Sequence, residues 1–208
     1  MSCRLTRIAR AEYNPEPRLP REAIMNGEST GPDDVVRFFG ITPRRHHAFD
    51  WHAVERSVGL RLPATYKYLA EHTPRGSFQG ALHLIRPGDL DHDESAYLGH
   101  YAYRIQDIRT AGTCPYPLHP DIGGLLPWGE GYFGELFFWR TDETEPDTWD
   151  IVFCDDAFGD WHTRPGPLPA FLLALGRGEI HLEGPTPPDP TTTPFFLESG
   201  NDPFRPDA

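Results

Sequence analysis

The sequence predicts an α+β fold, in which a mixed or antiparallel β-sheet is flanked by helices in a single domain with flexible N- and C-terminal extensions. Two apolar runs, Leu125–Trp128 and Leu136–Trp139, flank a connector that contains three glycines, as in a β-hairpin. Short amphipathic helical segments precede this hairpin, and an aromatic and β-branched run follows it. The second apolar run does not alternate with polar residues, which indicates a strand that has protein on both faces.

Length and composition predict one domain with extensions. The chain has 208 residues with 38% hydrophobic content, and its 23 prolines and 20 glycines indicate long loops. Residues 1–32 are arginine-rich and poor in large apolar side chains, so they are expected to be a flexible arm, within which Met25 is an alternative start. Residues 33–182 form the predicted domain. Residues 183–208 are a Pro/Thr-rich tail, whose Phe195–Leu197 is expected to dock on the domain.

Three helices are predicted before the sheet. Asp33 or Asp34 is expected to cap the first, which Gly40 ends. Asp50 is the expected N-cap of the second, in which Trp51, Val54 and Val58 share one face before Gly59 stops it. The third is predicted over 64–72, with Pro63 in its first turn and Tyr66, Leu69 and Ala70 facing inward.

The remaining elements follow from apolar patterning and from glycine and proline positions. Residues 76–80 are predicted to form a loop, and residues 81–85 a strand. A long amphipathic helix is predicted over 95–111, with Tyr97, Tyr101, Ile105 and Ile108 on one face. After the central hairpin, strands are predicted at 149–154 and at Trp161, and a last helix from Pro167 to Gly176.

No pattern of catalytic or metal-binding residues stands out. Cys3, Cys114 and Cys154 are far apart and lack a CxxC spacing, so they are expected to be reduced thiols. The sequence has no G-x-S-x-G elbow, phosphate-binding glycine motif or helical His-x-x-x-His. The acidic run that begins at Asp89 lacks the glycine and the final glutamate of a calcium loop. We therefore assign no catalytic residue, no metal and no cofactor.

Acidic residues concentrate in the second half of the chain. The net charge is −12, and between Asp121 and Asp160 eleven acids face one base, Arg140. Such a surface repels nucleic acid and attracts a basic protein. No apolar run approaches the roughly 20 residues of a membrane span, so a cytoplasmic protein is expected. An acidic surface that only maintains solubility remains the alternative.

The candidate partner-binding residues are the acids of this region and one aromatic side chain. Core packing is the default expectation for all five tryptophans, and Trp128, beside Gly129, is the best candidate among them for exposure in a groove. Glu130 and Glu135 are expected to be solvated turn acids rather than an acid/base pair. The candidates are Glu130, Asp142, Glu143, Glu145, Asp147, Asp155, Asp156 and Trp128.

A set of motifs in this order resembles the SUKH superfamily, in its yeast cell-wall-assembly-regulator (Smi/Knr-like) branch as found in actinobacteria. The motifs lie between about Asp50 and Gly178. They are Trp51-His-Ala-Val-Glu55, Gly59-Leu-Arg-Leu-Pro63-x-x-Tyr66, Gly80-x-Leu-His-Leu, Leu125-Leu-Pro-Trp-Gly129, Gly134-Glu-Leu-Phe-Phe-Trp139, Asp147-x-Trp149 and a closing Phe171-Leu-Leu helix. The motif residues assigned a structural role are Trp51, Glu55, Gly59, Leu62, Pro63, Tyr66, Pro127, Trp128, Gly129, Trp139 and Trp149.

The resemblance implies a function in protein binding. Bacterial members are proposed to be immunity proteins that bind and neutralise polymorphic toxins, often nucleases or deaminases, whereas fungal relatives are regulatory scaffolds. The superfamily has no shared catalytic set. We therefore expect a non-enzymatic domain that binds a basic toxin, and the oligomeric state stays open. The alternatives are a scaffold that binds endogenous proteins through its flexible ends, and a small-molecule hydrolase with a cleft near Trp128.

Overall fold

A seven-stranded antiparallel sheet with helices around it makes up the fold, so the α+β prediction is confirmed. The computed structural model describes residues 30–43, 47–89, 101–142, 145–180, 182 and 194–199. The sheet has the order β6-β5-β4-β3-β2-β1-β7. The strands are β1 Gly76–Phe78, β2 Leu82–Leu84, β3 Leu125–Gly131, β4 Leu136–Arg140, β5 Asp150–Cys154, β6 Trp161–Arg164 and β7 Phe196–Glu198. The helices are α1 Pro32–Phe38, α2 Trp51–Val58, α3 Ala64–His72, α4 Tyr101–Ala111 and α5 Leu168–Gly176, with a 3-10 helix, η2, at Pro146–Thr148.

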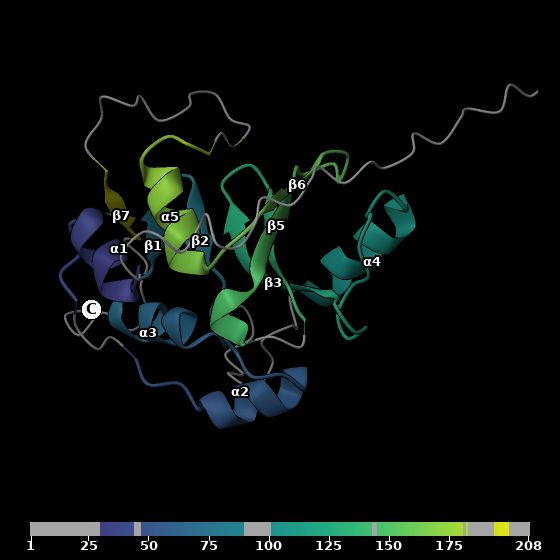
Figure 1. The fold of residues 1–208 in the computed structure, drawn as a ribbon, viewed down its shortest axis with the longest axis horizontal. Coiled ribbons are helices and arrows are strands. Elements are labelled where there is room, and N and C mark those ends of the chain that lie inside the picture. The colour runs from purple at the N-terminus through teal and green to yellow at the C-terminus, as the bar shows by residue number, and fades with distance from the viewer. Residues whose placement is uncertain are drawn as a thin grey trace, which may run out of the picture.

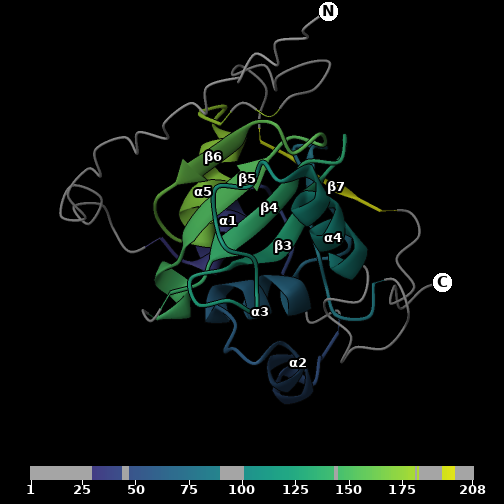
Figure 2. The same cartoon turned by 90° about the vertical axis from the view of Figure 1, so that its right-hand side faces the viewer.

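Helices lie on both sides of the sheet. In Figures 1 and 2, α1 and α5 lie on one side of the central strands and α4 lies on the other, while α3 and α2 lie at one end of the sheet. On the α5 side, the Phe171 ring lies 5.8 Å from the rings of Trp128, Phe137 and Phe153, measured between centroids. These contacts form the centre of the apolar core.

The strand β4 is buried on both faces, as its lack of alternation predicts. Phe137 faces α5, whereas the next residue, Phe138, packs against Trp161 of β6 with ring centroids 5.9 Å apart. Ile105 and Ile108 of α4 belong to the same buried core. The prediction that Ile105 and Ile108 face the core is therefore confirmed. The first residues of the predicted helix, Ser95–His100, lie outside the described residues.

The predicted hairpin is confirmed as β3 and β4, but Trp128 is not exposed. Its relative exposure is 0%, because its ring packs between Phe137 and Trp139 on the α5 side of the sheet. The register shifts between Pro127 and Gly129, so a β-bulge surrounds Trp128. The prediction that Trp128 lines a groove as a partner-binding side chain is therefore wrong.

Local capping signals predict α2 correctly and α1 only in part. Asp50 Oδ1 accepts a hydrogen bond of 3.0 Å from the Ala53 N–H, and Gly59 ends α2 with φ of 71°. The N-cap of α1 is Gly31, not Asp33 or Asp34, because Pro32 occupies the first helical position, which its fixed φ suits. Asp34 instead accepts a 3.0 Å hydrogen bond from the Gly31 N–H.

The loop predicted over 76–80 is wrong for its first half. Residues Gly76–Phe78 form β1, which pairs with β2 on one side and with β7 on the other. Because β7 comes from the region assigned to the tail, the predicted docking of Phe195–Leu197 is confirmed. The strands predicted at 81–85, 149–154 and Trp161 and the helix from Pro167 correspond to β2, β5, β6 and α5.

Candidate functional site

The acidic residues predicted to bind a partner fall into two groups at opposite ends of β5. In the antiparallel pair of β4 and β5, Arg140 is opposite Asp150 and Leu136 is opposite Cys154. The segment 141–149 therefore connects β4 to β5 at one end of this pair, and residues 155–156 follow β5 at the other end. Strand geometry places these ends about 13 Å apart. Glu143 lies outside the described residues.

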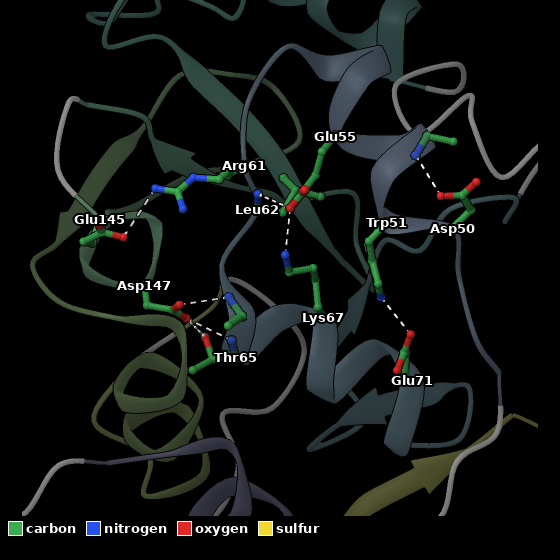
Figure 3. Close-up of polar contacts among 12 residues, drawn as sticks. Asp50, Trp51, Glu55, Arg61, Leu62, Thr65, Lys67, Glu71, Glu145 and Asp147 are labelled. Carbon is green, nitrogen blue, oxygen red and sulfur yellow. Dashed lines mark hydrogen bonds and ion pairs between the residues drawn. The ribbon is translucent and has the colours of Figure 1, made fainter.

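Asp147, in the first group, has a structural role. Its Oδ2 accepts a hydrogen bond from the Ala64 N–H at 2.9 Å, and its Oδ1 accepts from the Thr65 N–H at 2.9 Å and from Thr65 Oγ1 at 2.6 Å (Figure 3). These are N-terminal amides of α3, which a carboxylate satisfies and whose helix dipole it complements. Asp147 therefore joins η2 to α3.

Glu145 in the same group forms a weak contact. Its Oε2 lies 3.7 Å from Arg61 Nη2, and both side chains are more than 70% exposed. Exposed ion pairs of this kind contribute little to stability. Asp142 is also exposed, three residues before Glu145.

The motif residues Trp51 and Glu55 of α2 connect this helix to α3 through side-chain hydrogen bonds. Trp51 Nε1 donates to Glu71 Oε1 at 2.8 Å, and Glu55 Oε1 accepts from the Leu62 N–H at 3.0 Å and from Lys67 Nζ at 2.7 Å (Figure 3). Burial opposes ionisation of Glu55, but these hydrogen bonds outweigh burial, so its pKa lies below the ordinary value.

The other motif residues are also placed by the core. The Tyr66 hydroxyl donates to the Ile85 carbonyl oxygen, and its ring lies 5.1 Å from that of Trp139. At Gly129, a Cβ would lie 3.2 Å from the His83 carbonyl oxygen, which is a closer approach than most side chains accept. The further motif residues that are buried are Leu62, Pro63, Pro127, Trp128, Trp139 and Trp149. The motif therefore builds the domain and does not present a binding surface.

The turn of the β3–β4 hairpin presents two adjacent aromatic rings to solvent. Tyr132 is 76% exposed and Phe133 is 48% exposed, and their rings meet edge to face with centroids 5.1 Å apart. We call this pair the aromatic tip. Exposed large apolar side chains are normal when they are single, and the aromatic tip is a candidate site because two such side chains are adjacent.

Main-chain hydrogen bonds brace the aromatic tip. The Gly131 N–H donates to the Glu135 carbonyl oxygen at 2.8 Å, and the Tyr132 N–H donates to the Ala81 carbonyl oxygen at 2.8 Å. The Phe133 N–H donates to Glu135 Oε2 at 3.1 Å. These bonds hold the turn in one arrangement relative to the start of β2.

Glu135 is not the solvated turn acid that the sequence predicts. It is only 5% exposed, because its carboxylate folds back over Gly131, where any Cβ would overlap Oε2. A side chain at position 131 would therefore displace the Glu135 carboxylate from this place. Glu135 acts as an internal brace of the turn.

The turn between β5 and β6 lies beside the aromatic tip. Arg104 of α4 donates from Nη2 to the Gly134 carbonyl oxygen at 2.9 Å, and its guanidinium lies 5.1 Å from the centroid of the Phe158 ring. A Cβ on Gly134 would lie 3.2 Å from the Cβ of Asp156. The two turns are therefore neighbours that Arg104 connects.

Four acidic residues lie on β3 or in the β5–β6 turn, and Asp156 of that turn lies next to Gly134 of the β3–β4 turn. Asp155 Oδ1 accepts from the Gly159 N–H at 2.6 Å and from the Asp160 N–H at 3.1 Å, which fixes the shape of the β5–β6 turn. Glu130 lies on β3 just before the tip, with its Oε2 3.6 Å from His83 Nε2. We call the four acids Glu130, Asp155, Asp156 and Asp160 the acidic rim.

Three of the predicted partner-binding residues, Glu130, Asp155 and Asp156, therefore belong to this candidate site. The sequence reasoning missed Tyr132 and Phe133, because it attributed the whole glycine-rich connector to turn geometry. The signal was present as two consecutive aromatic residues between Gly131 and Gly134.

Of the three cysteines, Cys114 and Cys154 lie in the described part of the chain, and Cys3 lies outside it. Cys154 is buried, and burial raises its pKa to about 12. Burial also raises the pKa of the half-buried Cys114, and both are free thiols. Within the described part of the chain, no three His, Cys, Asp or Glu side chains converge as metal ligands. The helices that the structure describes include none long and apolar enough to cross a bilayer.

Comparison with known proteins identifies no relative. No protein-family model, curated protein or solved structure matches this chain. The membership of the SUKH superfamily that the motifs predict is therefore untested.

Proposed function

We propose that this chain is a non-enzymatic binding domain that neutralises a basic toxin by covering it, with the aromatic tip at the centre of the contact. The observation that carries the proposal is the pair of exposed rings on a braced hairpin turn. Tyrosine and phenylalanine supply large contact areas with few rotatable bonds, and interface hot spots are rich in such side chains. A turn that is already ordered loses little entropy when it binds.

The acidic rim supports a basic partner. Its four acidic residues belong to β3 and to the β5–β6 turn, whose Asp156 lies next to Gly134, and the neighbouring Arg104 is engaged with Gly134 and Phe158. A carboxylate surface of this kind raises the association rate of a cationic partner and disfavours acidic ones. The aromatic rings would then supply most of the affinity at the centre of the contact.

The resemblance to the SUKH superfamily supports toxin immunity as the purpose of this binding. Its bacterial members are proposed to act in this way, and the motif residues on which the resemblance rests are present in this chain. The hydrolase alternative depended on a cleft near Trp128. Because Trp128 is fully buried in the core, its side chain does not line such a cleft, and we keep the hydrolase as the less favoured alternative.

The scaffold alternative predicts binding through the two ends of the chain. Deletion of residues 183–208 would also remove β7 from the sheet, so a fair test deletes residues 1–29 and 200–208 and keeps β7. A scaffold that binds through its ends should lose its partner in this variant. An immunity protein that binds through the aromatic tip should keep it.

The proposal predicts that an adjoining gene encodes a toxin domain, and the test uses that domain, purified in an inactive form. The double variant Tyr132→Ala/Phe133→Ala should bind it about 100-fold more weakly and should fail to protect growing cells, which corresponds to about 3 kcal/mol for two interfacial rings. The matched control is Ile122→Ala, because Ile122 is 90% exposed and precedes β3 at its opposite end. This control should bind as the unmodified chain does.

Two results would contradict the proposal. One is that no product of an adjoining gene binds the chain. The other is that the double variant, shown to be folded by its unchanged thermal unfolding, binds and protects as well as the unmodified chain.

A further inference from the structure

The strand β7 recognises the outer edge of β1 mainly through its backbone. Three residue pairs form the ladder, Gly76 with Glu198, Ser77 with Leu197 and Phe78 with Phe196. The Gln79 N–H donates to the Phe195 carbonyl oxygen at 3.0 Å, and the Ser199 N–H donates to the Arg75 carbonyl oxygen at 2.8 Å. An extended segment of any sequence offers the same main-chain groups.

One aromatic side chain anchors this segment. The Phe196 ring packs edge to face on Phe78 with centroids 5.0 Å apart, and Phe78 packs in the same way on Phe39 at 5.0 Å. Leu197, the next residue, is 59% exposed. The β1 edge therefore selects an aromatic side chain at the position of Phe196 and accepts different side chains at the position of Leu197.

The edge itself is shaped to receive a strand closely. At Gly76, a Cβ would overlap the Leu197 carbonyl oxygen and the Phe196 ring, so only glycine permits this approach. Gln79 is buried and has a φ of 56°, which is uncommon for a residue with a side chain. Its Nε2 donates to the Gly176 carbonyl oxygen at 3.1 Å, and its Oε1 accepts from the Phe195 N–H at 3.1 Å.

The β1 edge and the strand β7 that pairs with it differ in their contacts with the rest of the domain. Gln79 is bound to α5 and β1 is paired with β2, so both stay in place without the tail. The inserted strand has three residues and pairs with β1 alone among the described strands. Thirteen residues, 183–195, separate Leu182 from Phe196, the first residue of β7, and five of them are prolines. Because β7 belongs to the same chain, it competes with a separate peptide as an intramolecular ligand, and a loss of affinity within β7 favours the peptide.

We propose that the outer edge of β1 is a binding site for an extended, aromatic-anchored peptide of another protein, and that segment 195–199 is its exchangeable resident ligand. The partner peptide would add to the sheet in place of β7, with its aromatic ring on Phe78 and its main-chain N–H on Gln79 Oε1. This site is separate from the aromatic tip, so the chain has two binding surfaces. Neither the peptide site nor its test depends on the toxin.

The test uses full-length protein and a fluorescein-labelled peptide with the sequence of residues 192–201. In the Phe196→Ala chain the resident segment lacks its anchor, so the peptide should bind at least about ten-fold more tightly than to the unmodified chain. The matched control is the Leu197→Ala chain, which removes an exposed side chain and should bind the peptide no better than the unmodified chain. A peptide that carries Phe196→Ala should not bind, whereas one that carries Leu197→Ala should.

A second measurement needs no substitution. Excess peptide added to the unmodified chain should speed the hydrogen exchange of the Phe195 and Ser199 amides, which lose their partners, while the Gln79 amide stays protected by the incoming strand. Absence of binding by the Phe196→Ala chain, when its unfolding transition shows that it is folded, would overturn the proposal. So would unchanged exchange at saturating peptide, or a stable dimer that exchanges tails and binds no peptide.

Discussion

Replacement of Asp147 by alanine removes the carboxylate that satisfies the N-terminal amides of α3. The Ala64 and Thr65 N–H groups and the Thr65 hydroxyl lose their acceptor, each at a distance of 2.9 Å or less. The substitution distinguishes between two roles of Asp147. The sequence indicates that it binds a partner, and the structure indicates that it caps α3. We therefore expect Asp147→Ala to destabilise the fold and to leave partner binding unchanged.

The magnitude follows from the number and kind of contacts. Loss of an N-terminal cap costs about 0.5–2 kcal/mol, and the side-chain bond to the Thr65 hydroxyl and the helix dipole add to this. We expect the free energy of unfolding to fall by about 2 kcal/mol. For a domain of this size the unfolding temperature should fall by about 4–8 °C. Asp147→Asn keeps one acceptor oxygen and should cost about half as much.

The assay is urea unfolding followed by tryptophan fluorescence, in parallel with toxin binding. Glu145→Ala is the matched control, because Glu145 is an acid of the same segment whose contact with Arg61 is exposed. Its stability should change by less than about 0.5 kcal/mol. An Asp147→Ala chain with unchanged stability and weakened toxin binding would refute the assignment of Asp147 to the fold.

Two other predictions concern titratable groups. Because hydrogen bonds from Lys67 and Leu62 lower the pKa of Glu55 despite its burial, Glu55 contributes stability above its unfolded pKa, and this contribution is lost as the pH falls through its folded pKa. The free energy of unfolding of Glu55→Gln should therefore depend less on pH below about pH 5 than that of the unmodified chain, and an equal dependence would contradict this explanation. Because burial raises the pKa of Cys154 to about 12, iodoacetamide at pH 8 should leave this thiol unmodified in the folded protein and label it in urea, as measured by peptide mass spectrometry; labelling of the folded chain would show that the site opens.

Local signals in the sequence predict the elements that local interactions define. The α2 helix begins at Asp50 and ends at Gly59 because a capping carboxylate and a glycine at positive φ act within a few residues. The β1 strand is different, since Gly76–Phe78 has a weak strand pattern and becomes a strand by pairing with Phe196–Glu198 at the far end of the chain. Strands that pair over such a long sequence separation need no strong strand pattern in their own residues, so the sequence does not reveal them.

In the candidate site too, local sequence signals predict some features, and contacts between distant segments determine the others. The sequence locates the acidic residues, but only the antiparallel pairing of β4 and β5 reveals that Asp147 and Asp156 leave opposite ends of the sheet. Burial of Trp128 depends on α5, which supplies Phe171 from a distant part of the chain. Exposure of Tyr132 and Phe133 depends on the turn geometry that Glu135 fixes.

Hydrogen exchange of the chain with and without the proposed toxin tests the central claim most directly. Binding through the aromatic tip should slow the exchange of the amides in residues 130–135 and 155–160, and should leave residues 117–123, around the exposed Ile122, unchanged. Protection around Ile122 or on another face, with unchanged exchange at the tip, would contradict it.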